Sequence, residues 1–436
     1  MNSLDEQFGV LQTRLPDQCA KVIELKNDAF ARFNALGFPT RKQEDWRYTD
    51  IKEIADQTYD LLPQAPDNAI EAQVSKLLET SALTQDEPRM VFIDGCYCER
   101  LSVPETESGI SISSLANDWD SYASEQSGHN GDSDHPLAAL NTAFVQDGAL
   151  IAVTDGLRVN QPVHLVFAGS DRSGLAPQPR IIIRVGKNAD VTVVQHFLDT
   201  EHAAGWVNLV TEISQAANSK LTLYRFQEHG TQTLHTTLLH AELAQNAQLS
   251  AGLLELGGRL VRNDLDIKLT EPGAEVDLFG VFLAESGQHM DNHIRVDHLA
   301  AYTTSKETFR GIIGDQGHGV FNGKVVVHRG AQHVDAKQNS DNLLLSDRAQ
   351  IDTKPELEIY ADDVKCSHGA TVGELDEEQL FYLRARGIDA EAARGLLTFA
   401  FANSALDKIE IPRLRQRFAA GIAQRVAHHS TWETLP

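Results

Sequence analysis

From about residue 150 onward, the chain alternates short β-rich runs with turns, as in LIAV, VHLVF, RIIIRV and DVTVVQHF. The turns share one pattern: a turn-forming residue, a small residue, a polar residue and an aliphatic residue. Copies of this pattern start at Asn188, Asn218, Asn246 and Gly273, at intervals of 30, 28 and 27 residues. Asn and Gly readily adopt the positive φ that a sharp corner needs.

This long period predicts a solenoid. Ala300–Thr303 is a degenerate copy of the turn, and Gly330 begins another. A single turn of chain cannot bury its inner face, so successive turns stack and share a core. A sandwich of hairpins would place turns every 8–12 residues or so without this longer register. We therefore expect a mostly β protein, with a parallel β-helix or closely related β-solenoid over residues 150–375.

The region before the solenoid has a helical pattern. Phe30, Phe33 and Leu36 are spaced as on one face of a helix that ends before Gly37. The segment 121–135 is polar, contains glycine and lacks periodicity, which indicates a loop. We predict a largely helical N-terminal domain over residues 1–149, with this polar loop near its end.

The region after the solenoid is also predicted to be helical. Asp376 and Asp389 are helix N-cap candidates, and Pro412 suits the first position of a third helix. We predict a C-terminal helical domain over residues 376–436. Between residues 384 and 425 there are eight basic and four acidic side chains. This basic surface is either a solvated face or a docking module.

Composition and charge limit the function classes. The chain has 436 residues, of which 42% are hydrophobic and 23% charged, as in ordinary soluble proteins. No apolar stretch approaches the roughly 18 residues that span a membrane, and the first residues, MNSLDEQFGVLQTRL, do not resemble a signal peptide. The net charge of −24 argues against nucleic acids and anionic membranes as partners. We expect a cytoplasmic protein.

The cysteines are too few for a disulfide framework and too scattered for a ferredoxin-like cluster site. They are Cys19, Cys96, Cys98 and Cys366. The C-x-C at Cys96 and Cys98 is a weak metal motif. If the chain holds an iron–sulfur cluster, it must share the ligands with a partner.

Cys366 and His368 form the most informative pair of residues. They lie two positions apart between a strand-like run and a helix start, so on an extended backbone both point to one face. A thiolate and an imidazole together suit iron or iron–sulfur chemistry. The alternative is a structural cysteine beside a hydrogen-bonded histidine, and C-x-H alone does not separate the two.

Other histidines are predicted to be structural. In QHMDNHIRVDH, His289 and His293 would lie about 13 Å apart on one face of a strand, too far for one ion, so this segment reads as a polar ladder. His318, His328 and His333 come from neighbouring strands and are also assigned structural roles. Gly323-Lys324 lacks the remaining residues of a phosphate-binding loop, so no nucleotide site is expected.

Four long segments together resemble the SufB/SufD family of iron–sulfur cluster assembly proteins, and within it the SufD-like subunits. They follow one another along most of the chain: GFPTRKQEDWRYTDI, HPLAALNTAF, DNHIRVDHLA and the run from Phe309 to Ile388. Residues 61–134 and about the last twenty carry no such resemblance.

The resemblance implies a right-handed parallel β-helix in a non-catalytic scaffold subunit. Such a subunit would pair with a SufB-like subunit and bind SufC-like ATPase subunits through its C-terminal helices. A transient iron–sulfur cluster would form at the subunit interface, where His368 would face a partner cysteine and act as metal ligand. Cys366 would be its companion, as a ligand, sulfur relay or redox-sensitive neighbour. The resemblance does not decide whether the isolated chain forms a homodimer or whether the complex binds reduced flavin.

Two alternatives remain. The first is the SufB-like paralogue, which would carry the main sulfur acceptor; the low cysteine count and the string KCSHG favour the SufD side. The second is a β-helix enzyme that acts on polysaccharides. Such enzymes are usually exported, and their grooves use stacked aromatic residues and clustered carboxylates, of which the sequence has no evident set.

Overall fold

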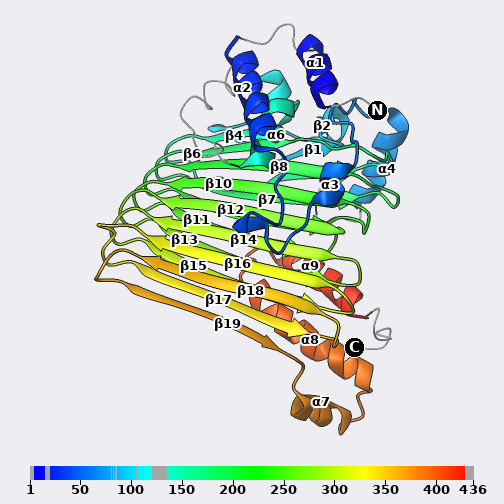
Figure 1. The fold of residues 1–436 in the computed structure, drawn as a ribbon, viewed down its shortest axis with the longest axis vertical. Coiled ribbons are helices and arrows are strands. Elements are labelled where there is room, and N and C mark those ends of the chain that lie inside the picture. Colours follow the sequence, from blue (N-terminus) through cyan, green and yellow to red (C-terminus); the bar gives the residue numbers. More distant parts are fainter. Residues whose placement is uncertain are drawn as a thin grey trace.

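Two large β-sheets face each other in the computed structural model, and helices flank them at both ends of the chain (Figure 1). The structure describes residues 4–427 except 15–19, 80, 82, 84–85, 105–106 and 120–134. In the described part, no helix has the length and apolar character needed to span a membrane.

One sheet has nine strands and the other has ten. The nine-stranded sheet contains β3 (Ile110–Ser114), β4 (Gly148–Val153), β6 (Arg180–Val185), β8 (Trp206–Gln215), β10 (Leu234–Leu243), β12 (Leu260–Leu269), β14 (His289–His298), β16 (His318–Val327) and β18 (Gln350–Ile359). The ten-stranded sheet contains β1 (Arg89–Ile93), β2 (Cys96–Tyr97), β5 (Val163–Gly169), β7 (Asp190–Asp199), β9 (Lys220–Glu228), β11 (Gln248–Glu255), β13 (Glu275–Ala284), β15 (Thr304–Ile313), β17 (Asp335–Leu344) and β19 (Lys365–Gly373).

From β4 to β19 the chain alternates between the two sheets, and each strand lies parallel to the strand two places before it. Each pair of strands is therefore one turn of a β-solenoid, and the molecule has about eight turns. The predicted solenoid architecture with helical flanks is confirmed. Inward-facing aliphatic and aromatic side chains from both sheets form one continuous core along most of its length.

The middle turns also bury a chain of polar side chains. Arg225 donates from Nε to Gln195 Oε1 (2.9 Å) and from Nη1 to Asn263 Oδ1 (3.3 Å). Asn263 and Asn292 in turn donate to the two carboxylate oxygens of Glu255. All five side chains are buried. A buried charge is costly unless hydrogen-bonded, so this relay favours one alignment of these turns over alternatives.

The predicted corners have the expected backbone conformation. Asn188, Asn218, Asn246 and Gly273 have φ of 56°, 60°, 55° and 77°. The degenerate copy predicted to start at Ala300 also contains a corner, but it lies two residues later, at Tyr302, with φ of 61°.

The next corner differs from the prediction. The Tyr302 N–H donates to Gln332 O, which places His333, with φ of 60°, in the equivalent position. Gly330 has positive φ as well, at 89°, but belongs to an extra turn that precedes the corner. A short insertion therefore shifted the sequence alignment of this turn.

The N-terminal region caps the first turns. Its helices and short 3₁₀ segments are α1 (Leu4–Arg14), α2 (Ala20–Leu36), η1 (Glu44–Trp46), α3 (Lys52–Asp56), α4 (Asn68–Glu79), η2 (Glu99–Leu101), η3 (Leu115–Asn117) and α6 (Pro136–Phe144). The helical pattern did not reveal β1, β2 and β3, which extend both sheets beyond β4 and β5. Most of the predicted polar loop, residues 121–134, lies outside the described residues.

The C-terminal region forms α7 (Glu377–Arg384), α8 (Ala390–Leu406) and α9 (Pro412–Ala427). The Asp376 carboxylate accepts hydrogen bonds from two N–H groups in the first turn of α7, and Asp389 accepts one from Ala392 in α8, so both predicted caps are confirmed. α7 lies beyond the last strand of the solenoid (Figure 1). α8 and α9 pack on the outer face of the ten-stranded sheet through a shared apolar cluster that includes Phe226, Phe279 and Phe418.

Several basic side chains of this region form ion pairs with the solenoid. Lys408 Nζ lies 2.7 Å from Asp277 Oδ1, and Arg417 Nη2 lies 2.9 Å from Glu228 Oε2. Arg413 pairs with the buried carboxylate of Glu87. Part of the basic charge noted in the sequence therefore attaches α9 and its preceding loop to the chain's own sheet. This charge is not all available to a partner.

The corner geometry yields a test of the solenoid's local requirements. We expect Asn188→Val to lower the free energy of unfolding by about 1–2 kcal/mol, because a β-branched residue is strained at positive φ. Asn188→Gly should change it by less than about 0.5 kcal/mol, since glycine tolerates this conformation. Chemical denaturation of both variants measures the difference. Equal stability of the two variants would contradict the corner assignment.

Candidate metal-ligand site at the open end of the solenoid

The solenoid ends at β18 and β19 without a covering turn. In the described part of the chain, β18 pairs only with β16, and β19 pairs only with β17. The outer edge of each terminal strand therefore presents unpaired backbone N–H and C=O groups. β19 is the last strand in Figure 1 and carries both sequence-predicted site residues, Cys366 and His368.

Cys366 is directed toward the interior of the solenoid. It lies in register with Ala336 of β17 and packs against an apolar cluster that includes Val325 and Val334. Burial raises the pKa of the Cys366 thiol, and the nearby charge of Asp335 acts in the same direction. The thiol is consequently held in its neutral, weakly nucleophilic form at neutral pH.

His368 has a different environment from Cys366. It lies in register with Gln338 of β17 on the same face of the strand as Cys366, as the sequence predicted. No further turn covers it among the described residues, and its side chain is exposed. The structure thus places an accessible imidazole beside a partly buried thiol on one strand edge.

Apolar side chains surround this open end. Ile359 ends β18 and Tyr360 follows it, Val372 lies on β19, and Phe381 and Tyr382 lie on α7; their exposed fractions range from 43% to 73%. Large apolar residues gathered at an uncovered end are typical of a surface that binds another protein. The backbone edges of β18 and β19 add hydrogen-bonding capacity to the same surface.

Two polar residues behind His368 were missed in the sequence. Glu307 and Gln338 precede His368 in its inward-facing column, on β15 and β17, and both are buried. Gln338 Nε2 donates to Glu307 Oε2 at 2.8 Å. Burial raises the pKa of Glu307 to about 7, while the hydrogen bond from Gln338 lowers it. The signal in the sequence is a polar residue at a position that faces the core. Such a position can be identified only once the strand register is known.

The remaining cysteines do not join this site. Cys96 and Cys98 lie at the opposite end of the sheet, on and just after β2. Burial raises the pKa of both thiols, that of Cys96 to about 11. Cys19 lies outside the described residues. Within the described ranges, no group of three or more His, Cys, Asp or Glu side chains is arranged to hold a metal ion.

The histidines assigned structural roles make contacts within the fold. His289 Nδ1 lies 3.1 Å from His318 Nδ1, so His289 pairs with a neighbouring strand instead of with His293. His328 contacts Asp297 (2.6 Å), and His333 contacts Asp363 (2.9 Å). The contacts of His289 and His328 involve residues of the polar ladder predicted for β14, whereas that of His333 lies at a corner.

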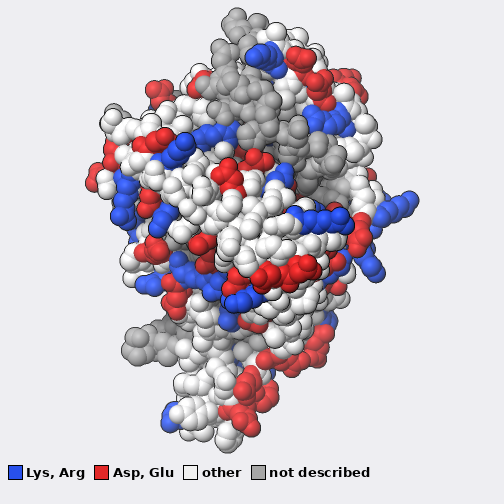
Figure 2. All heavy atoms as spheres, turned by 90° about the vertical axis from the view of Figure 1, so that its left-hand side faces the viewer, with Lys and Arg blue, Asp and Glu red and all other residues white. Residues whose placement is uncertain are grey.

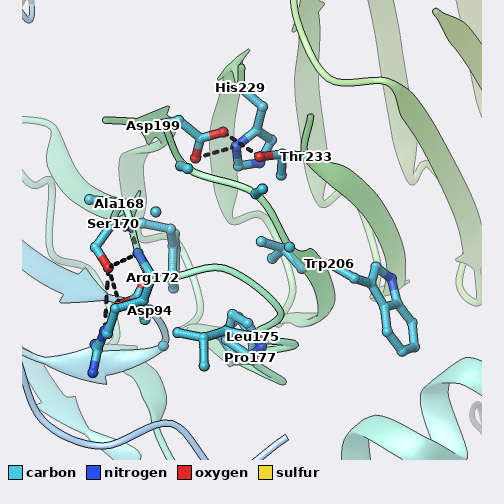
Figure 3. Close-up of a pocket in the computed structure, with 18 residues that line it drawn as sticks. Asp94, Ala168, Ser170, Arg172, Leu175, Pro177, Asp199, Trp206, His229 and Thr233 are labelled. Atoms are coloured by element: carbon cyan, nitrogen blue, oxygen red, sulfur yellow. Dashed lines mark hydrogen bonds and ion pairs between the residues drawn. The ribbon is translucent and has the colours of Figure 1, made fainter. Parts of the chain in front are cut away.

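A small, partly open cavity of about 40 Å³ lies near the first turns of the solenoid, at the end opposite β19 (Figure 3). On one side, Asp94 accepts hydrogen bonds from Ser170 and Arg172; on the other, Asp199 contacts His229 and accepts from Thr233. These polar groups bind one another and brace the loops between strands.

A larger, polar groove of about 900 Å³ runs over the outer face of the nine-stranded sheet. Its basic and acidic side chains are mostly paired, as in Lys324 with Glu358 and Arg295 with Asp297. The view in Figure 2 likewise shows acidic and basic side chains interspersed over the surface. The paired charges make this groove a ladder of ion pairs, some within one strand and some across neighbouring strands.

Together, the fold and the open end define a class of protein: a β-solenoid that presents an exposed histidine on the uncovered edge of its last strand. The chain matches the model of the SUF system FeS cluster assembly SufBD core domain over residues 167–401 and that of the SufBD protein N-terminal region over residues 4–165. This chain belongs to the SufB/SufD family of iron–sulfur cluster assembly proteins.

Individual relatives support the same assignment. The chain is 30% identical to the iron–sulfur cluster assembly protein SufD of Escherichia coli, covering 89% of this chain and 90% of the relative. It is 30% identical to the chloroplastic protein ABCI7 of Arabidopsis thaliana, covering 87% and 81%, respectively. It is 26% identical to SufD of Bacillus subtilis, covering 67% of each. The family resemblance noted in the sequence is confirmed.

The buried carboxyl behind the site predicts a pH dependence of stability. Because the pKa of Glu307 rises from 4.5 to about 7 on folding, the folded chain binds this proton more tightly than the unfolded chain. The resulting stability is complete below pH 4.5 or so and is lost as pH rises through 7. Between these limits, wild type should lose roughly 3 kcal/mol of unfolding free energy relative to Glu307→Gln.

Denaturation at a series of pH values measures this difference. Glu201→Gln, which removes an exposed carboxyl from a loop between strands, serves as the control. Parallel pH profiles for wild type and Glu307→Gln would show that Glu307 does not carry this effect.

Proposed function

We propose that this chain is a non-catalytic scaffold subunit of a complex that assembles iron–sulfur clusters and passes them to apoproteins. The single observation that carries the proposal is the exposed imidazole of His368 on the open terminal strand of a SufB/SufD-family solenoid. An imidazole is a suitable ligand for iron and needs an accessible nitrogen to bind it. The cluster is the cargo of this process.

The open end suits a second subunit of similar construction. Its two strand edges can pair with the edges of a SufB-like solenoid, and its exposed apolar side chains can be buried in the contact. His368 and Cys366 supply at most two ligands, whereas iron bound by N and S ligands commonly has four. The partner would therefore contribute the missing ligands, including a cysteine facing His368. In isolation, two copies of this chain could form a homodimer through the same end.

Within this pair, His368 would be the metal ligand and Cys366 an auxiliary residue. The raised pKa of the Cys366 thiol and its apolar contacts disfavour a free thiolate before the partner binds. A cysteine desulfurase would supply the sulfur as a persulfide, and two electrons per sulfur, from reduced flavin on the complex or from another reductant, would convert it to sulfide.

The C-terminal helices are proposed to bind a SufC-like ATPase subunit, whose ATP hydrolysis would reshape the scaffold pair and expose the assembly site. The chain itself would bind no nucleotide. Because α9 is attached to the solenoid, the exposed basic residues of α7 and α8 and their connection are the better docking candidates. Arg384, Arg386 and Arg394 are exposed there, and no ion pair holds them within the described residues.

His368→Ala tests the role in cluster assembly. We expect the purified complex to lose most of its cluster, because the variant removes a ligand, while subunit association and ATPase activity remain. The side chain is exposed, so unfolding free energy should change by less than about 1 kcal/mol. Iron and sulfide content per complex, measured with the melting temperature, gives the result.

Full cluster content in the His368→Ala complex would overturn the proposed ligand role. Cys366→Ser provides a graded comparison: a defect as severe as that of His368→Ala would make the thiol a ligand as well. A milder defect would support the auxiliary role.

The docking proposal is tested by charge reversal. Arg384→Glu/Arg394→Glu should weaken binding of the ATPase subunit at least tenfold, because it converts two exposed positive charges into negative ones. Arg158→Glu/Lys187→Glu makes the same change in exposed loops at the other end of the solenoid and should bind as wild type. Titration calorimetry with the purified ATPase subunit compares them. Equal affinity of both double variants would exclude the α7–α8 surface.

A further inference from the structure

One inward-facing column changes from apolar to polar toward the open end. In successive strands of the ten-stranded sheet, Leu278, Glu307, Gln338 and His368 occupy equivalent positions. Leu278 belongs to the main apolar core, whereas Glu307 and Gln338 are polar and only 1% and 3% exposed. The polar part of the column therefore begins two strands before the surface and leads directly to His368.

The hydrogen bonds within the column are incomplete. Gln338 Nε2 donates to Glu307 Oε2 at 2.8 Å, but Gln338 Oε1 is buried without a hydrogen-bond partner among the described residues. Buried polar atoms nearly always find partners, because an unpartnered one lowers stability. Adjacent strands lie about 4.8 Å apart, so a side chain on β19 can reach the Gln338 amide oxygen. His368 is the residue of β19 that lies in register with Gln338.

The opposite sheet is shaped around this amide. A Cβ atom at Gly323 of β16 would lie 2.0 Å from Gln338 Nε2 and 2.8 Å from its amide carbon. Real Cβ contacts are essentially never this close. Glycine at position 323 thus leaves the space in which the Gln338 amide lies against Glu307.

We propose that Glu307 and Gln338 are positioning residues for His368: Glu307 orients the Gln338 amide, and the exposed His368 side chain turns so that its ring N–H donates to the free Gln338 Oε1. This bond fixes one tautomer and directs the other ring nitrogen, with its lone pair, toward the open end. Hydrogen bonds of this kind commonly orient histidines that bind metals. The inference that this arrangement assists iron binding rests on the proposed function, whereas the hydrogen bond between Gln338 and His368 does not depend on it.

The test is the tautomer of His368 in the metal-free chain. Protein labelled with ¹⁵N-histidine is studied by long-range ¹H–¹⁵N NMR at pH 8, and the His368 signal is identified by its loss in His368→Ala. We expect one dominant tautomer in wild type and a mixture of both in Glu307→Met/Gln338→Met. Replacing both buried partners by apolar residues of similar length leaves no orphaned polar group, so the double variant should fold.

Two further variants separate the proposed bond from general disturbance. Gly323→Ala keeps Glu307, Gln338 and His368 but crowds the amide, so it should also produce mixed tautomers. Asn339→Leu is the control: Asn339 is adjacent to Gln338 but faces outward, and its side chain donates to Asp341. This variant should have the same tautomer population as wild type. An unchanged tautomer population in the double variant would overturn the proposal.

The outcome is independent of the cluster measurements. Because the NMR readout uses the metal-free chain, it stands even if His368→Ala retains its cluster and the ligand role fails. Conversely, cluster loss in His368→Ala with an unaltered tautomer in Glu307→Met/Gln338→Met would support the ligand role and reject the positioning residues.

Discussion

The stacking of turns is the constraint on which the rest of this structure depends. Each strand satisfies its backbone only through the strands on either side, and each inner face is buried only by the turns next to it. Both requirements fail at the ends of the stack. At the start, β1, β2 and β3 extend the sheets, with α4 and α6 packed nearby. At the other end, β18 and β19 remain open, and the candidate site lies there because the stack ends there.

The parts of the fold that could be predicted are those that repeat. Corners at Asn188, Asn218 and Asn246 could be recognised because positive φ restricts the residues allowed at each one. The corner at His333 could not be aligned, since an insertion interrupted the period. The strands β1, β2 and β3 were missed for a related reason: they are too short to show a pattern, and pairing with β5, β1 and β4, respectively, is what makes them strands.

The candidate site also has one part that the sequence predicts and another that it does not. That Cys366 and His368 share a face follows from strand geometry alone. Their different surroundings depend on which neighbours exist in space. Cys366 is covered by Val325 of β16, in the facing sheet, and by Val334, which directly precedes β17, whereas His368 is exposed. Glu307 lies about sixty residues earlier in the chain, so only the register brings it into the column of His368. Sequence spacing cannot supply that information.

The open edges of β18 and β19 also have a consequence for the amount of this protein that a cell can hold. Backbone edges are alike in every strand, so edges that bind a different partner, as proposed, would bind a second copy of this chain through the same groups. Self-association grows with the square of this chain's concentration, whereas hetero-association grows with the product of two concentrations. Under the proposed pairing, synthesis in excess of the partner would divert the surplus into like pairs, and the fold would make balanced production of the two subunits a requirement on gene expression.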